Sequence, residues 1–131
     1  MKNLIILFGL TMLLILGSCK DKDANKEIVI LSPQEFYDAT AQKDLQLLDV
    51  RTSKEFEEGH LEDAVNIDVL EDDFSAKAES LDKEQPVYLY CRSGNRSAKA
   101  SAILTDLGFK EIYDMQGGYL QWESEDIEAN N

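Results

Sequence analysis

The stretch from residue 86 to residue 108 constrains the fold of this chain more than any other part of the sequence. Residues 86–90 (Pro-Val-Tyr-Leu-Tyr) are mostly β-branched and aromatic, which predicts a buried strand. Residues 97–107 place apolar side chains at helical spacing, and Gly108 follows as a typical helix stop. The loop between them, residues 91–96, therefore lies where a strand ends and a helix begins.

This loop (Cys-Arg-Ser-Gly-Asn-Arg) carries a thiol and two guanidinium groups on one short turn. The first amide groups of a helix have no intrahelical partner, and the helix dipole adds partial positive charge there, so the position favours an anion. We therefore expect Cys91 to be a nucleophilic thiolate, stabilised by these amides together with Arg92 and Arg96. The alternative is a buried structural cysteine, for which two arginines, a glycine and an asparagine make a poor apolar environment.

Strand and helix signals alternate along the rest of the chain. Strands are predicted at residues 27–31, 46–50, 66–67 and 111–114. Helices are predicted from a capping serine and proline at residues 32–33 to about Ala41, in a short segment that runs through Phe56 to a stop at Gly59, and at residues 74–81. This order indicates an α/β architecture with a central, mainly parallel sheet flanked by helices. Ligands bind such sheets beyond the carboxyl ends of the strands, where the 91–96 loop is expected.

The charge balance of the chain limits its partners. The chain has 131 residues, enough for one domain, and a formal net charge of −13 at pH 7. This acidity argues against a nucleic-acid partner and against electrostatic attraction to anionic lipid. Because the 91–96 loop is locally basic, we expect a small anionic substrate.

The N-terminus has the pattern of a targeting segment. Lys2 supplies a positive charge, and residues 4–16 form an apolar run that is too short to span a membrane comfortably. Residues 16–19 (Leu-Gly-Ser-Cys) resemble the lipobox of bacterial lipoproteins, in which cleavage before the cysteine leaves it as the lipid-modified first residue. We therefore expect a signal peptide at residues 1–18 and a lipidated Cys19 that begins a charged tether at residues 19–26. An ordinary signal peptide, or an uncleaved anchor with an incidental cysteine, is the alternative.

The expected lipid has consequences for charge, location and redox state. Loss of residues 1–18 removes Lys2 alone among the charged residues, so the charge of −13 becomes −14. The membrane partner would then be reached through the lipid at Cys19, which places the domain in the bacterial cell envelope, on its periplasmic or cell-surface face. Only two cysteines are present, so a lipidated Cys19 leaves Cys91 as a free thiol. An unmodified Cys19 would instead allow a Cys19–Cys91 disulfide in oxidising surroundings.

Four separated segments form a recognisable pattern. They are residues 47–51 (Leu-Leu-Asp-Val-Arg), residues 55–67 (with Glu-Phe, Gly-His-Leu, Ala and Asn-Ile at their expected places), residues 91–97, and Gly117-Gly118 followed by Trp122. Together they resemble a single-domain rhodanese, a thiosulfate sulfurtransferase, over about residues 28–124. One departure is Glu62-Asp63, which stands where family members often have Pro-Gly.

The resemblance implies a single rhodanese-like domain at residues 27–125, followed by an acidic tail at residues 126–131. It makes Cys91 the catalytic nucleophile, which takes a sulfur from thiosulfate and passes it, as a persulfide, to cyanide or a thiol. Substrate binding is assigned to the loop residues, whose backbone amides would cradle the persulfide and whose two guanidinium groups would hold the donor: Arg92, Ser93, Gly94, Asn95, Arg96 and Ser97. No metal or organic cofactor is implied, and we expect a monomer.

Other polar and aromatic residues receive lesser roles. Asp49 and Arg51 end a strand near the expected pocket and are predicted to support the loop by hydrogen bonds or an ion pair. His60 is the only histidine; a general-base role is the alternative to the structural role that the resemblance implies. Gly117 and Gly118 are expected to permit a tight turn, and Trp122 to pack in the core.

Two other functions stay open from the sequence. The first is a phosphatase of the cysteine-arginine kind, but such enzymes hold five residues between the cysteine and the arginine, whereas four separate Cys91 from Arg96. The second is a catalytically idle binding or redox-sensing module, which the presence of Cys91 disfavours.

Overall fold

The computed structural model describes residues 27–42 and 44–130. The predicted signal peptide (1–18), the lipid site Cys19 and the tether (19–26) lie outside these residues. The elements, in chain order, are β1 (Glu27–Leu31), α1 (Pro33–Thr40), β2 (Gln46–Asp49), α2 (Ser53–Glu58), β3 (Val65–Asn66), α3 (Phe74–Ala78), β4 (Val87–Tyr90), α4 (Asn95–Leu107), β5 (Glu111–Met115), α5 (Gly118–Glu125) and α6 (Ile127–Asn130).

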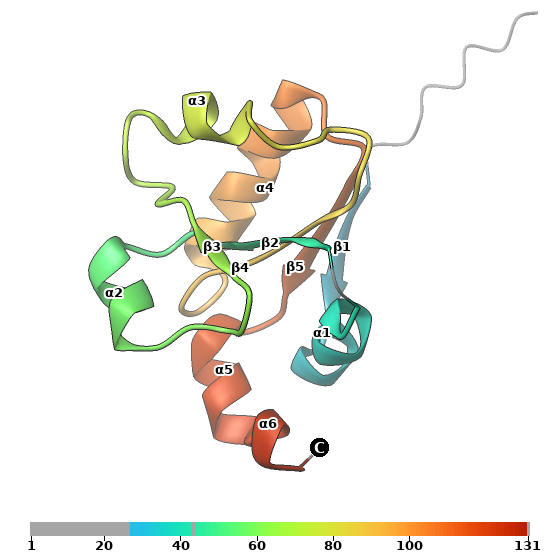
Figure 1. The fold of residues 1–131 in the computed structure, drawn as a ribbon, viewed down its shortest axis with the longest axis vertical. Helices are drawn as coiled ribbons and strands as arrows, with labels where there is room; N and C mark the ends of the chain where they lie inside the picture. The colour runs from blue at the N-terminus through green and yellow to red at the C-terminus, as the bar shows by residue number, and fades with distance from the viewer. Residues whose placement is uncertain (1–26, 43, 131) are drawn as a thin grey trace, which may run out of the picture.

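Within the described residues, the strands form one five-stranded sheet in the order β1-β5-β4-β2-β3. Every neighbouring pair is parallel. The predicted α/β architecture with a parallel sheet is therefore confirmed, and β4, which precedes Cys91, occupies the centre of the sheet. Figure 1 shows α3 and α4 on one side of the sheet and α1, α5 and α6 on the other.

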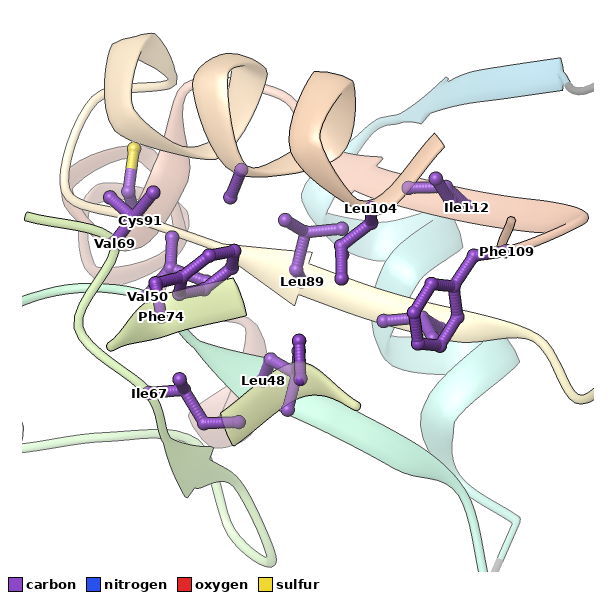
Figure 2. Packing of buried hydrophobic residues seen from close by; sticks show 13 residues of the cluster. Leu48, Val50, Ile67, Val69, Phe74, Leu89, Cys91, Leu104, Phe109 and Ile112 are labelled. Atoms are coloured by element: carbon purple, nitrogen blue, oxygen red, sulfur yellow. The ribbon is translucent and has the colours of Figure 1, made fainter. Parts of the chain in front are cut away.

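Two apolar clusters fill the space between the sheet and these two helix layers. The first contains Phe74 of α3 and Leu104 of α4, and the second contains Phe36 of α1 and Trp122 of α5. Side chains alternate between the faces along β4: Val87, Leu89 and the following Cys91 belong to the first cluster, whereas Tyr90 belongs to the second. Figure 2 shows the first cluster, with Leu89 and Leu104 between the sheet and α4.

Two helix starts follow from capping boxes. The Ser32 side chain accepts a hydrogen bond from the Glu35 N–H of α1, and the Glu35 carboxylate accepts one from the Ser32 N–H. Thr52 and Glu55 make the same reciprocal pair at α2. The second box matters for function because it fixes the position of Glu55.

Several predicted bounds differ from the structure. Helix α4 begins at Asn95 rather than Ser97, so the 91–96 loop is shorter than expected. Helix α5 was not predicted, because its alternation of polar and aromatic residues gives little helical periodicity. The packed structure also continues past residue 125: the expected tail at residues 126–131 contains Ile127, which is 3% exposed in the second cluster.

Within the described residues, no helix has the length and apolar character needed to cross a membrane.

Candidate active site

Cys91 directly follows β4 and is 1% exposed. Strand alternation directs it to the same face as Leu89, so it packs in the first cluster with Val50, Val69 and Phe74. The prediction of a poor apolar environment is therefore wrong, because this cysteine is buried in a cluster of apolar core residues. The sulfur itself points away from these residues and toward the first turn of α4 (Figure 2).

Polar groups meet the sulfur on its remaining side. The Gly94 N–H donates a hydrogen bond to Cys91 Sγ at 3.0 Å, and the thiol lies 3.4 Å from the Ser97 hydroxyl. Gly94 has a φ of 106°, a left-handed conformation that turns its amide back to the sulfur. The thiol thus lies at the N-terminus of a 13-residue helix, where backbone amides favour a negative charge.

Arg96 makes an ion pair with Glu55 of α2. Its two terminal nitrogens lie 2.7 and 2.8 Å from the two carboxylate oxygens, and the side chains are 22% and 21% exposed. Hydrogen bonding with Arg96 lowers the pKa of Glu55 to about 2. The same hydrogen bond raises the pKa of Arg96, and the charge of Cys91 adds to this rise. Arg96 is therefore held beside the thiol, with its charge largely neutralised by a carboxylate.

The other loop side chains point outward. Arg92, Ser93 and Asn95 are exposed, and within the described part of the chain no ion pair or side-chain hydrogen bond is found for Arg92. Of the two arginines, Arg92 is thus the one whose guanidinium group is available to an incoming anion.

The Gly117-Gly118 turn holds the loop backbone in place. The Tyr119 N–H donates to the Cys91 carbonyl at 2.8 Å, and the Leu120 N–H donates to the Arg92 carbonyl at 3.0 Å. A Cβ on Gly118 would lie 2.5–2.6 Å from backbone atoms of Arg92 and Cys91, and its φ is 62°. Only glycine allows this close approach, which gives the predicted tight turn its reason.

Asp49 and Arg51 form a buried ion pair on the opposite face of the sheet. They are 0% and 2% exposed, and Arg51 Nε lies 2.9 and 3.0 Å from the two Asp49 oxygens. The Tyr90 hydroxyl donates to Asp49 at 2.8 Å, and the Arg51 guanidinium lies 4.3 Å from the Tyr119 ring centroid. Because Tyr90 precedes Cys91 and Tyr119 binds its carbonyl, the pair acts on the loop through these two tyrosines.

Burial and charge shift the pKa values in this network. Burial alone would lower the pKa of Arg51, but its hydrogen bond with Asp49 and the Asp49 charge outweigh burial and raise it. Burial, reinforced by the Asp49 charge, holds the pKa of Tyr90 well above its ordinary value. Both groups thus keep their protons at neutral pH and act as fixed hydrogen-bond donors.

His60 and Trp122 lie outside the Cys91 loop. His60 is exposed, its ring stacks on Phe56 at 3.7 Å, and its Nδ1 donates to the Phe56 carbonyl at 2.8 Å. Trp122 is 6% exposed and packs against Tyr37 at 5.7 Å. These contacts give both residues structural roles. The described part of the chain brings together no group of His, Cys, Asp and Glu side chains that could hold a metal ion.

A groove of about 660 Å³ lies on the face of the sheet that carries the second cluster. Tyr37, Leu47 and Trp122 contribute to its lining, which includes no described residue of the 91–97 segment. It is therefore separate from the thiol, and the chemistry of the site is carried by the smaller, polar loop around Cys91.

The family model of the rhodanese-like domain matches residues 32–125. The chain belongs to the rhodanese-like domain family. The predicted family is therefore confirmed, and its single domain accounts for nearly all of the described residues.

Two curated relatives of this rhodanese-like protein have different names. The thiosulfate sulfurtransferase GlpE of Coxiella burnetii is 33% identical over 95 residues, which cover 72% of this chain and 86% of that protein. The tRNA uridine(34) hydroxylase of Chlamydia abortus is 35% identical over 108 residues, which cover 78% of this chain. The chain spans only 33% of the length of this hydroxylase, so the similarity is limited to one part of it.

Solved structures support the rhodanese fold. The rhodanese-related protein from Thermoplasma volcanium matches with a TM-score of 0.65 at 29% identity, covering 74% of this chain and 92% of that chain. The human single-domain sulfurtransferase TSTD1 matches in fold with a TM-score of 0.63 at 24% identity, covering 73% of this chain and 96% of that chain.

The structure of this rhodanese-like domain adds two carboxylates that the sequence analysis did not assign to the site. Glu55, 41 positions from Arg96 in the sequence, is its ion-pair partner. Asp114 is 4% exposed on β5, and its pKa depends in part on the Ser97 side chain. The sequence does contain a signal for Asp114, because this charged residue stands between Tyr113 and Met115 in a predicted strand. Charged residues are rarely buried, so such a position indicates a special role. For Glu55 the capping box gave its position on α2 but not its partner.

Proposed function

We propose that this rhodanese-like domain transfers a sulfane sulfur from thiosulfate, or a similar anionic donor, to cyanide or a thiol through a persulfide on Cys91. The observation that carries this proposal is the Gly94 N–H, which lies 3.0 Å from Cys91 Sγ at the N-terminus of α4. A Cys91 thiolate gains a hydrogen bond there, and the helix dipole favours the negative charge of a thiolate or of a persulfide. The similarity to a protein named thiosulfate sulfurtransferase, of which 86% is covered, supports the choice of donor.

The reaction proceeds in two displacements. In the first, the Cys91 thiolate attacks the outer sulfur of thiosulfate, the S–S bond of the donor breaks, and sulfite leaves with the bonding electron pair. In the second, cyanide or a thiolate attacks the outer sulfur of the persulfide, and the Cys91 thiolate is released. Between the two displacements the negative charge is on the outer sulfur of the persulfide and not on Cys91 Sγ. The Gly94 N–H contacts Sγ and therefore stabilises the thiolate that begins and ends the cycle.

The two arginines take different parts in this cycle. Arg92 is exposed and meets the dianionic donor as it approaches the loop. Arg96 is ion-paired with Glu55 and acts on the thiolate as a partly neutralised charge beside it. This division differs from the expectation that both guanidinium groups hold the donor.

The geometry disfavours a phosphatase. Such a reaction needs the arginine to grip the phosphoryl oxygens, whereas both terminal nitrogens of Arg96 are bound to Glu55. The hydroxylase relative offers no alternative of equal weight, because the chain spans only 33% of its length. A catalytically idle binding module remains as the outcome of a negative assay.

The test is thiocyanate formation from thiosulfate and cyanide by the purified chain. We expect activity in the wild type, its loss in Cys91→Ser, and its retention in Cys19→Ser, the matched control that removes the other cysteine. Unchanged activity in Cys91→Ser would overturn the persulfide mechanism. Hydrolysis of an aryl phosphate without thiocyanate formation would favour the phosphatase, and no activity on either substrate would favour the idle module.

We further propose that the domain is held at a membrane of the bacterial cell envelope by a lipid on Cys19. The lipobox-like residues 16–19 and the charged segment 20–26 support this attachment, because acyl chains can anchor a protein that has no electrostatic attraction to the bilayer. In a Gram-negative host, the wild type should fractionate with membranes and Cys19→Ala should not. Mass spectrometry that finds an unmodified Cys19 would remove the anchor and would make a Cys19–Cys91 disulfide testable.

A further inference from the structure

Asp114 is a buried carboxyl group that the proposed sulfur transfer does not use. It is 4% exposed, and its Oδ1 has no hydrogen-bond partner within the described part of the chain. On β5 it lies in register with Leu89 of β4, whose side chain packs under α4 in the first cluster. Since neighbours in register point to the same face of a sheet, Asp114 faces α4 and shares a side of the sheet with Cys91. A buried carboxyl group with one unpaired oxygen is costly, so its position calls for an explanation.

Ser97 links this carboxyl to the thiol. Ser97 is fully buried on the first turn of α4, and its hydroxyl has a single proton with three neighbours that can accept it. These are the Gly94 carbonyl at 3.1 Å, Cys91 Sγ at 3.4 Å and the Asp114 carboxyl, whose hydrogen bond with Ser97 lowers its pKa. The protonation of Asp114 therefore affects where the Ser97 proton points.

We propose that Asp114 is a positioning residue that directs the Ser97 hydroxyl toward or away from Cys91 Sγ. A protonated Asp114 donates to Ser97 Oγ, which leaves the Ser97 proton free to bind the Cys91 thiolate or persulfide. An ionised Asp114 accepts the Ser97 proton instead and leaves the sulfur with the Gly94 amide alone. The proposal rests on the proposed function, because sulfur transfer is the reaction in which a negative charge on Cys91 would be used.

Asp114 changes its protonation state close to neutral pH, so the direction of the Ser97 hydroxyl can change there. Burial raises the pKa of Asp114 to about 6, and the hydrogen bond with Ser97 opposes the rise. Its strand neighbours in register, Ile30 of β1 and Leu89 of β4, are uncharged. From α4 it meets the hydroxyl of Ser97, and within the described residues no charged side chain contributes to its shift.

The charged groups around the thiol itself are the two loop arginines and two carboxylates. Arg96 of α4 is sensitive to the charges of Cys91, Glu55 and Asp68, and Arg92 lies exposed in the loop. The Glu55 carboxyl, with its pKa of about 2, stays ionised throughout the range in which Asp114 titrates. A change in thiol reactivity near pH 6 is therefore assigned to Asp114 and not to Glu55.

The experiment measures the rate of iodoacetamide alkylation at Cys91 between pH 5 and 9 by peptide mass spectrometry of the full chain. Asp114→Asn keeps the shape of the side chain and a donor to Ser97, and so imitates the protonated carboxyl. We expect the alkylation profile of this variant to lie about one pH unit below that of the wild type, which means a reaction up to about ten-fold faster at pH values where the wild-type thiol is still mostly protonated. The wild-type profile should show a shoulder near pH 6 that Asp114→Asn lacks.

Two further variants separate positioning from a direct effect of charge. In a Ser97→Ala background the Asp114→Asn substitution should have no effect on the profile, since the connecting hydroxyl is gone. Ser101→Ala, one helical turn further along α4, is the matched control: its hydroxyl is also buried and without a partner among the described residues, and its profile should equal that of the wild type.

Coincident profiles for the wild type and Asp114→Asn, with no shoulder near pH 6 in the wild type, would overturn the proposal. So would an Asp114 effect of equal size in the Ser97→Ala background. Alkylation reports the thiol whether or not the chain transfers sulfur, so a negative thiocyanate assay with a shifted profile would count against the proposed function and leave the positioning role standing. A positive assay with unshifted profiles would do the reverse.

Discussion

The ion pair between Glu55 and Arg96 contributes stability that depends on pH, and Glu55→Gln removes it while keeping a side chain that can accept the capping hydrogen bonds from Thr52. The pair, together with smaller contributions from the Thr52 hydrogen bonds, lowers the pKa of Glu55 from 4.5 to about 2, which corresponds to at most about 3 kcal/mol. Because both side chains are about one-fifth exposed, solvent screening reduces this to about 1–2 kcal/mol.

The sign follows from the lowered pKa. The carboxylate contribution is fully present above the unfolded-state pKa of about 4.5 and is lost as the pH falls toward about 2. In urea denaturation, the free energy of unfolding of Glu55→Gln should therefore be about 1–2 kcal/mol below that of the wild type at pH 7, and the gap should close between pH 4.5 and pH 2. Glu57→Gln, which changes an exposed carboxylate on the same helix, is the control and should match the wild type. A gap that is equally large at pH 7 and pH 3, or absent at pH 7, would refute the reasoning.

Three other perturbations have expected outcomes. Gly118→Ala should lower the free energy of unfolding by more than about 2 kcal/mol and reduce thiocyanate formation, because a left-handed alanine would also press on the backbone of Arg92 and Cys91; a stability equal to that of the wild type would contradict this. Arg92→Ala should raise the KM for thiosulfate several-fold while urea denaturation stays unchanged, with exposed Lys99→Ala as the control, and an unchanged KM would show that Arg92 does not meet the donor. The free energy of unfolding of Asp114→Asn minus that of the wild type should be larger at pH 7 than at pH 4, by up to about 3 kcal/mol. This follows because burial raises the pKa of Asp114 to about 6, and a difference independent of pH would refute it.

The central part of the fold follows from local sequence signals. The apolar run before Cys91 predicts β4, and the capping residues at Ser32 and Glu35 predict α1 to within one residue of its end. Helix α5 escapes prediction because its position is set by Gly118, which lies against the backbone of Arg92 and Cys91. That contact is a property of the tertiary structure and leaves no helical pattern in the sequence.

The candidate site divides in the same way. The position of the Cys91 thiol at a helix N-terminus, with the Gly94 amide beside it, follows from residues 91–97, because one strand–loop–helix unit contains them all. Arg96 was expected to hold the donor, but its partner Glu55 comes from another element and takes up both terminal nitrogens. Asp114 likewise reaches Ser97 only because β5 lies beside β4 in the sheet. Contacts between elements that are distant in the sequence thus decide which charges near the thiol are free, and no local pattern contains that information.

The two carboxylates near the thiol oppose each other in their effect on stability. Glu55 adds stability as the pH rises from about 2 to 4.5, whereas Asp114, whose folded-state pKa is raised, removes stability as the pH rises from about 4 to 6. These two groups alone place the most stable pH of the domain between about 4 and 5, and the net charge of −13 adds self-repulsion at higher pH. If Asp114 directs Ser97 as proposed, the loss of stability near pH 6 is the cost of keeping a titratable carboxyl behind the nucleophile. An asparagine at position 114 would then give a more stable domain in which the reactivity of Cys91 no longer responds to pH near 6.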